Sequence, residues 1–314
     1  MKVLKSYAGL LVFLLLLIAF FSFKSQHFFS SGTLISLLNQ IPALMVIAVG
    51  MTFVLIIAGI DLSVGSVLAL ASSVIGVAML DWGWGLPTAV ALALLVGALC
   101  GALNGVITVK WAIPSFIVTL GMLEIARGGA YLVTGSSTKY IGAAVEGVAT
   151  PIGGLGLSPA FIVAVLVVVA GQLVLSKTIW GRYALAIGAG ESVVVYSGIN
   201  PRSVKVGVFA LSGLLSGLGA LFYASRLGSA DPNAGIGLEL QAIAAVVIGG
   251  TSLMGGRGSV VRSFIGVLII AILETGLAQI GASEPTKRLI TGFVIVIAVI
   301  ADVYRVRLAG KSKN

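Results

Sequence analysis

Apolar stretches long enough to cross a membrane recur along the whole chain, and they constrain its fold more than any other feature. A helix of about 20 apolar residues spans roughly 30 Å of hydrocarbon. The 314-residue chain is 59% hydrophobic and only 9% charged, whereas soluble domains carry about 25% charged residues. Its mean hydropathy is +1.16. The sequence therefore predicts an all-α polytopic membrane protein.

Ten spans are expected, within a single transmembrane domain that covers residues 1–314. The first, "YAGLLVFLLLLIAFFSF", follows two lysines as a signal peptide would, but it lacks a convincing small-residue cleavage site and is expected to remain as a helix. The approximate ranges are 7–23, 34–58, 62–80, 86–107, 113–134, 159–176, 204–225, 240–254, 261–280 and 287–304.

The distribution of Lys and Arg along the chain indicates its membrane topology. Most of the 19 Lys and Arg residues fall on connections that this topology places on one side of the membrane. By the positive-inside rule, that side is the cytoplasm and both termini lie there, which requires an even number of spans. The net charge of +9 therefore gives no reason to expect a nucleic acid partner.

Catalytic and metal-dependent functions have little support. With Cys100 as the sole cysteine and His27 as the sole histidine, neither a disulfide nor a Cys/His metal site can form within the chain. The glycine-rich stretch "GGTSLMGGRG" lacks the GK[ST] ending of a phosphate-binding loop. The chain is expected to be no enzyme and to hold no cofactor of its own.

An internal repeat is faint but has a specific consequence. Aligning "GIDLSVGSVLAL" (residues 59–70) with "GIGLELQAIAAV" (residues 235–246) gives four identities in twelve positions. The two stretches are five spans apart, so they lie in opposite orientations. This pattern predicts an inverted repeat of spans 2 to 5 and 7 to 10, the arrangement from which transporters build alternating access.

Ionisable residues inside the expected spans are candidates for a polar path, because each costs roughly 2.5–3.5 kcal/mol on insertion scales. Glu124 and Arg127 are three residues apart and share a helix face. One interpretation is a structural ion pair, and the other is a pair that lines or gates a path. For Glu274, an interhelical contact is favoured over a role with solute.

Asp61 lies in "IIAGIDLSVGSVLAL", where Gly59 is expected to break the second span. In one interpretation the carboxylate caps the start of the third span, with Ser63 and Ser66 adding polar groups nearby. In the other, it contacts a polar solute. Short spacings such as Gly97, Gly101 and Gly105 are assigned to close helix packing.

Two hydrophilic connections stand out. The outer one, "GSSTKYIGAAVEGVATPIGGLGLSP" (residues 135–159), offers a surface to something outside the membrane. The inner one, residues 176–205, is apolar at intervals and is expected to contain a short amphipathic helix that lies against a soluble partner.

Several motifs in order resemble the permease subunits of bacterial ABC importers for sugars, the ribose-type family. They are "HFFSSGTLISLLNQ", "AVGMTFVLIIAGIDLSVGSVLAL", "WGRYALAIGAGESVVVYSGIN" and "GIGLELQAIAAVVIGGTSLMGGRGSV". The resemblance implies a location in the bacterial inner membrane and a second permease copy or a paralogue. It also implies a cytoplasmic ABC ATPase that holds the ATP and Mg, and a periplasmic or lipid-anchored solute-binding protein.

In that family an inner loop of the pattern G-G-N-E-A-A followed by S-G-I docks on the ATPase. Residues 177–203 are expected to play this part. The ATPase-coupling residues carried over from the resemblance are Gly188, Glu191, Ser197, Gly198, Ile199 and Asn200. Ala189, Gly190, Ser192 and Val193 depart from the pattern, and Ala58 stands where the family's G-G-I-D motif has its first glycine.

The expected function is import of a monosaccharide or a similar small polar solute by alternating access. The candidates for the translocation path are Asn39, Gln40, Asp61, Ser63, Asn104, Glu124, Arg127 and Gln241. The alternative is an ion-coupled secondary transporter or channel that works without an ATPase, with Asp61, Glu124 and Glu274 as proton or ion sites. A membrane scaffold that transports nothing is a third class. Pentoses, hexoses, autoinducer-2-like molecules and nucleosides all remain open as solutes.

Overall fold

The computed structural model describes the backbone of residues 2–311 and the side chains of residues 7–300, apart from Ile295 and Ala298. Met1 and residues 312–314 lie outside the described residues, and with them Lys313 of the C-terminus expected in the cytoplasm.

Residues 2–311 form fourteen α-helices and one small sheet. The helices are α1 (Lys2–Lys24), α2 (Ser31–Gln40), α3 (Pro42–Ile56), α4 (Val64–Leu80), α5 (Leu86–Lys110), α6 (Ser115–Thr134), α7 (Ala143–Glu146), α8 (Pro159–Lys177), α9 (Ile179–Ala189), α10 (Glu191–Tyr196), α11 (Pro201–Leu227), α12 (Leu238–Ile248), α13 (Val260–Gln279) and α14 (Glu284–Lys311). Strands β1 (Lys139–Tyr140) and β2 (Ser229–Ala230) pair antiparallel.

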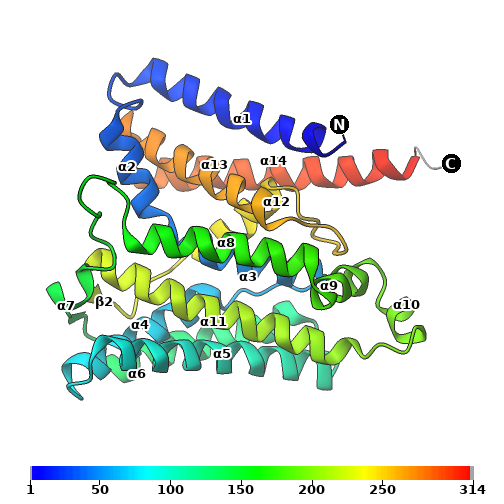
Figure 1. Ribbon diagram of the computed structural model, residues 1–314, viewed down its shortest axis with the longest axis horizontal. Helices are drawn as coiled ribbons and strands as arrows, with labels where there is room; N and C mark the ends of the chain where they lie inside the picture. Colours follow the sequence, from blue (N-terminus) through cyan, green and yellow to red (C-terminus); the bar gives the residue numbers. More distant parts are fainter. Residues whose placement is uncertain (1, 312–314) are drawn as a thin grey trace.

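The long helices lie side by side in one bundle (Figure 1). Helix α7 and the two-stranded sheet lie at one end of it, called the α7 end below. Helices α9 and α10 lie at the opposite end, the α10 end, where α1 begins and α14 ends (Figure 1). The beginning of α1 and the end of α14 are therefore on the same side as the loop that resembles an ATPase-docking element.

Six helices among the described residues are long and apolar enough to cross a membrane: α1, α5, α6, α8, α11 and α13. Helices α2 and α3 meet at a bend of 49° and make a seventh if they are counted as one span. The all-α, multi-pass class is thereby confirmed. The count of ten stays a prediction, because α4 and α12, which coincide with two expected spans, have only 17 and 11 residues.

Two segments of the chain interrupt the helices inside the bundle. The first, residues 57–63, follows α3 and precedes α4; the second, residues 231–237, follows β2 and precedes α12. We call them the first break and the second break. From its break, α4 runs to the α7 end, where Asp81 pairs with Lys139 at 2.8 Å. Helix α12 runs the opposite way, toward the α10 end, where Gly255 lies against Gly188.

The starts of α4 and α12 touch each other. A Cβ on Gly65 would clash with the carbonyl oxygen of Gly235 and lie 2.5 Å from Glu239 Oε2, and a Cβ on Gly235 would lie 2.7 Å from the Gly65 oxygen. Only glycine permits this approach of the two backbones. The two breaks therefore meet at one junction.

Small residues also bring α5 and α11 together, as the glycine spacing predicts. A Cβ on Gly97 would clash with the carbonyl of Gly213, and one on Gly213 would clash in turn with the carbonyl of Gly97. A Cβ on Gly101 would lie 2.9 Å from the Phe209 carbonyl carbon. The assignment of these glycines to close packing is confirmed.

Gly65→Val is expected to destabilise the protein, because the added side chain has to separate two backbones at the junction. Overpacking of this kind costs about 1–3 kcal/mol. Thermal unfolding of the purified protein in detergent measures the effect. Gly9→Val in α1 is the matched control, because no heavy atom lies within 4 Å of a Cβ at that position. Equal melting temperatures for the two variants would contradict the close contact between Gly65 and the second break.

Candidate functional site

Asp61 is the centre of a buried polar cluster, with a side chain that is only 1% exposed. Its Oδ1 accepts hydrogen bonds from the Ser63 amide at 3.0 Å and the Ser63 hydroxyl at 2.6 Å. Its Oδ2 accepts one from the Ser212 hydroxyl of α11 at 2.9 Å. Asn104 of α5 donates to the Ser63 hydroxyl oxygen at 3.0 Å. The cluster thus ties the first break to α5 and α11.

The expected capping role of Asp61 needs a correction. Helix α4 begins at Val64 after Ser63, and no side chain caps it. Asp61 accepts from the Ser63 amide just before the helix, not from a first-turn amide. Ser66 takes no part in these hydrogen bonds, whereas Ser212, which the sequence did not single out, does.

Helix α6 satisfies the backbone of the first break. The Ser115 hydroxyl oxygen accepts from the Ile60 amide at 2.9 Å, and the Thr119 hydroxyl oxygen accepts from the Leu62 amide at 3.1 Å. The Thr119 hydroxyl in turn donates to the Ile60 carbonyl at 3.2 Å. Inside a membrane these groups have no water to bond, so the two side chains supply partners that a helix would otherwise provide.

The same helix satisfies the second break. Arg127 Nη1 donates to the carbonyls of Pro232 at 2.6 Å and Ala234 at 2.8 Å. Tyr131 donates to the side chain of Asn233. With Ser115 and Thr119, these residues are spaced by multiples of four, so they follow a ridge that winds gradually round α6. One helix therefore holds both breaks.

The Glu124–Arg127 ion pair that the spacing suggests does not form. None of the ion pairs among the described side chains joins the two residues, and Glu124 is exposed on α6. The guanidinium of Arg127 is directed to the second break instead. Glu274 makes the expected interhelical contact, because Gln241 Nε2 of α12 donates to Glu274 Oε1 of α13 at 2.7 Å.

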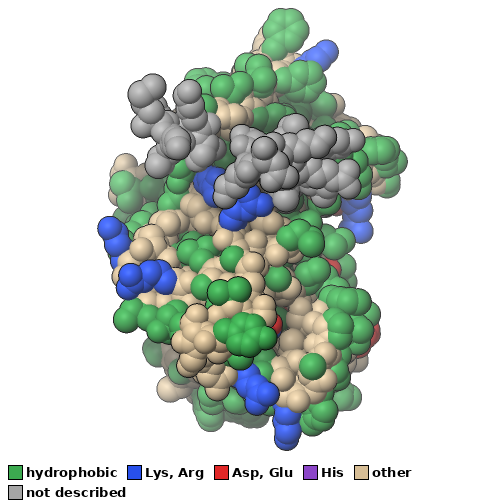
Figure 2. All heavy atoms as spheres, turned by 90° about the vertical axis from the view of Figure 1, so that its right-hand side faces the viewer, with side chains coloured by type: hydrophobic (Ala, Val, Ile, Leu, Met, Phe, Trp, Pro, Cys, Tyr) green, Lys and Arg blue, Asp and Glu red, His purple; other side chains and the backbone are tan. Residues whose placement is uncertain are grey.

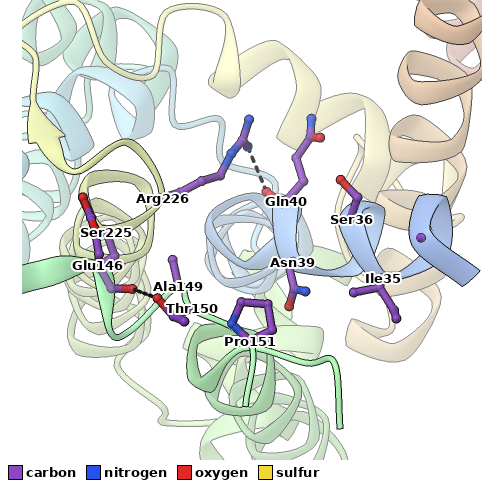
Figure 3. A pocket seen from close by; sticks show the side chains of 11 residues that line it. Ile35, Ser36, Asn39, Gln40, Glu146, Ala149, Thr150, Pro151, Ser225 and Arg226 are labelled. Carbon is purple, nitrogen blue, oxygen red and sulfur yellow. Dashed lines mark hydrogen bonds between the residues drawn. The ribbon is translucent and has the colours of Figure 1, made fainter. Parts of the chain in front are cut away.

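The α7 end contains a cavity of about 540 Å³ between α2, the loop after α7 and the end of α11 (Figure 3). Strands β1 and β2 bring together the two segments that border it, residues 135–159 and 226–239. Arg226 Nη1 donates to the Gln40 carbonyl at 3.3 Å across the top of this cavity. The Asn39 side chain holds the loop between α7 and α8. Its Nδ2 donates to the Gly156 carbonyl, and its Oδ1 accepts from the Ser158 amide.

At the α10 end, α9 packs directly against the end of α3, just before the first break. A Cβ on Gly188 would clash with the carbonyl oxygen of Ile56 and with the amide of Gly256, and that amide donates to the same carbonyl at 2.8 Å. Gly188 therefore has to be glycine. A shift of α9 reaches the end of α3 without any intervening side chain.

The other residues carried over for coupling surround α10. Glu191 pairs with Lys205 at 2.6 Å, Gly198 has a φ of 76° that favours glycine, and Asn200 caps α11 by accepting from the Arg202 amide at 3.0 Å. Ser197 donates to the Val193 carbonyl within α10. Glu191, Gly198, Ile199 and Asn200 also line a cavity of about 830 Å³ that extends to the ends of α5 and α6.

Helix α10 leaves an apolar surface uncovered. Val193 is 67% exposed, Val195 52% and Tyr196 89%, while Val194 is buried. Lys and Arg side chains surround this end of the bundle and few acidic ones are visible there (Figure 2). The basic residues at the helix ends and loops there include Lys110, Lys177, Arg182, Arg202, Lys205 and Arg257.

Comparison with known proteins identifies the family. Residues 33–299 match the family described as "branched-chain amino acid transport system / permease component". The chain belongs to this family. As such a permease it transports and does not catalyse, and in these importers ATP is hydrolysed by a separate subunit. No solved structure matches the permease.

Relatives over nearly the whole length carry more specific names. The permease is 41% identical to the ribose import permease of Haemophilus influenzae, over 93% of this chain and 91% of the relative. It is 35% identical to a fructose import permease of Rhizobium meliloti, over 93% and 84%. It is 33% identical to an L-arabinose ABC transporter permease of Azospirillum brasilense, over 95% and 88%. The resemblance to ribose-type ABC permeases is confirmed.

No group of three or more His, Cys, Asp or Glu residues among the described side chains could hold a metal ion. The polar groups around the breaks and cavities include amides, hydroxyls, a few carboxylates and the guanidinium groups of Arg127 and Arg226.

Asp61→Ala is expected to lower stability by about 2–4 kcal/mol, because it leaves three buried donors without their acceptor. Asp61→Asn keeps one acceptor oxygen and should lose about half as much. Thermal unfolding in detergent measures both. If Asp61→Ala melted like the unsubstituted protein while transport was lost, Asp61 would be a solute contact and not part of the architecture.

Arg127→Met is expected to loosen the second break, because the carbonyls of Pro232 and Ala234 lose their donor. Hydrogen exchange of the amides in residues 231–237 should become about tenfold faster, the equivalent of ~1.4 kcal/mol. Glu124→Gln, one turn away on α6, is the matched control and should leave this exchange unchanged. Unchanged exchange in Arg127→Met would show that Arg127 does not hold the second break in place.

Proposed function

We propose that this permease, an ABC importer subunit, carries a monosaccharide inward across the bacterial inner membrane by alternating access. It would work with a second permease copy or paralogue, a cytoplasmic ATPase that holds ATP and Mg, and a periplasmic or lipid-anchored binding protein. Both termini and residues 177–203 would face the cytoplasm. The single observation that carries this proposal is the uncovered apolar surface of α10, at the basic end of the bundle.

Helix α10 is suited to dock on a soluble ATPase. Its exposed side chains Val193, Val195 and Tyr196 form a small hydrophobic patch rimmed by basic residues, the composition of a protein interface. Behind the patch, α9 contacts the end of α3 through Gly188. Motion of the ATPase would therefore reach the first break through backbone contacts.

An inverted repeat is supported by the order of helix packing. Helix α4 contacts α5 and α6, as α12 contacts α13 and α14. Helix α11 contacts α4 and α5, as α3 contacts α12 and α13. The two breaks, each before a short helix, occupy equivalent places in the two halves. With this repeat, and with α4, α12 and α14 each counted as a span, the proposed topology has ten spans.

The α7 end is proposed to receive the binding protein. Residues 135–159 and 226–239 are joined there by the β1–β2 pairing, and Arg226 and Glu146 border the cavity between them (Figure 3). Charged groups of both signs around a cavity provide the electrostatic complementarity that orients a docking partner.

A monosaccharide is proposed as solute from the names of the relatives, which import ribose, fructose or arabinose. Among the path candidates, Asp61, Ser63 and Asn104 bond mainly to each other and Asn39 holds a loop. Gln40, Gln241, Glu124 and Arg127 remain as the more accessible candidates.

Reconstitution separates the proposal from its alternative. In liposomes with the ATPase and a loaded binding protein, sugar uptake should require ATP. The permease alone, under a proton or sodium gradient, should take up no sugar. Uptake driven by the gradient alone would favour an ion-coupled secondary transporter or channel.

Tyr196→Ala is expected to reduce ATP-dependent uptake about thirtyfold, because removal of a central interface aromatic costs ~2 kcal/mol or more. The melting temperature should not change, since the ring is 89% exposed. Phe23→Ala is the matched control: this aromatic is also 89% exposed, near the end of α1 at the opposite end of the bundle (Figure 1). Equal uptake by the two variants would argue against docking through α10.

A further inference from the structure

A second cavity toward the α7 end lies between α12, α13 and α14 and has a volume of about 730 Å³. Its polar lining includes Gln241 of α12, Glu274 and Thr275 of α13, and Thr291 of α14. A monosaccharide fits easily within this volume. Sites for small molecules commonly combine an apolar wall with a few placed polar groups, and here Ile236 and Leu240 supply apolar wall.

Two polar atoms in this cavity lack partners within the described part of the chain. Gln241 and Glu274 share one hydrogen bond, from Nε2 to Oε1, which fixes the orientation of both side chains. Glu274 Oε2 and Gln241 Oε1 form no hydrogen bond with the described residues. Both are acceptors held in place, which is the arrangement that binds adjacent hydroxyl groups of a sugar.

The charges at the rim of the cavity are already paired. Lys287 lies 2.9 Å from Glu284, and Arg288 lies 3.7 Å from the same carboxylate. The hydrogen bond from Lys287 holds the pKa of Glu284 below its usual value, so this rim carboxylate is ionised. Formally, Lys287 and Arg288 balance the carboxyl groups of Glu284 and Glu274, so the cavity favours a neutral solute over an ion.

The cavity has an equivalent at the α10 end. The cavity near Gln241 is bordered by the second break, the end of α13 and the start of α14. Its equivalent, the cavity behind α10, is bordered by the first break, the end of α5 and the start of α6. Gln40 lines both the cavity near Gln241 and the one shown in Figure 3. A solute released at the α7 end would therefore reach Gln241 and Glu274 by way of Gln40.

We propose that the cavity between α12, α13 and α14 is a solute subsite that binds a neutral polyhydroxylated molecule through Glu274 and Gln241. This inference rests on the proposed import function and goes further, because it assigns the residues that hold the solute after the binding protein releases it. Glu274, which the sequence favours as a packing contact, then has both roles: one oxygen orients Gln241 and the other accepts from solute.

Uptake by the complete complex gives the first test. In liposomes containing the permease, its ATPase and its binding protein, Glu274→Gln combined with Gln241→Ala should lower sugar uptake about tenfold through loss of a charge-assisted hydrogen bond. ATP hydrolysis stimulated by the loaded binding protein should remain. Glu274→Asp should restore part of the uptake. Gln26→Ala, an exposed glutamine between α1 and α2, is the matched control.

Protection of a single cysteine gives the second test, without any need for ATP. In a Cys100→Ser background, Ala278→Cys places a thiol on the cavity wall, and Gln26→Cys places one outside it. Millimolar D-ribose, D-fructose or L-arabinose should slow the reaction of the first thiol with a small water-soluble thiosulfonate and leave the second unaffected. Leucine is the comparison probe.

The outcomes separate the subsite from the wider function. Loss of uptake in the double variant, together with protection by a sugar, supports the subsite. Normal uptake in the double variant, or no protection by any sugar while the unsubstituted complex imports sugar, overturns the subsite and leaves the import function standing. Protection by leucine alone, with no sugar uptake by the unsubstituted complex, overturns the proposed solute class and the subsite with it.

Discussion

The whole arrangement depends on two stretches of non-helical backbone that lie inside a membrane protein. In hydrocarbon every unpaired amide or carbonyl costs several kcal/mol, so such a stretch persists only where other groups satisfy it. Helix α6 does this for both breaks, through Ser115 and Thr119 at one and Arg127 at the other. A single helix thus connects the two breaks.

Glycine makes the second essential set of contacts. Gly65 lets α4 begin against the second break, and Gly188 lets α9 rest on the end of α3. Any side chain at these positions would separate the backbones. Between the uncovered surface of α10 and the junction, the contacts are therefore largely between backbones. Closely packed backbones leave few side chains that could absorb a displacement by rearranging. Such stiffness suits a subunit whose work is driven by a partner outside the membrane.

Hydropathy and motif order predicted the membrane class, the long spans and the family. The glycine spacings predicted close packing of α5, and "AGID" located the first break. The contacts that hold the breaks were not predictable, because Ser212 is 151 positions from Asp61 and Pro232 is 105 from Arg127. The bounds of the short helices were not predictable either: α12 ends at Ile248, within an apolar run expected to reach residue 254, since a hydrophobic run does not reveal how much of it is extended. Ala58, with its φ of 59°, occupies a conformation that explains the family's glycine there.

Whether the polar atoms of a residue already have hydrogen-bond partners distinguishes residues that hold the fold together from residues that could bind solute. Asp61 is ionisable and buried, but its oxygens are occupied by Ser63 and Ser212. A solute would have to displace those donors, which weak, reversible binding does not compensate. In Gln241 and in Glu274, one side-chain atom makes the hydrogen bond that orients both side chains, and one oxygen has no partner among the described residues. A neutral sugar needs such pre-oriented acceptors and no net charge. Asn104 Oδ1 also has no partner among the described residues, but it is fully buried, whereas the free oxygens of Gln241 and Glu274 belong to side chains that line a cavity.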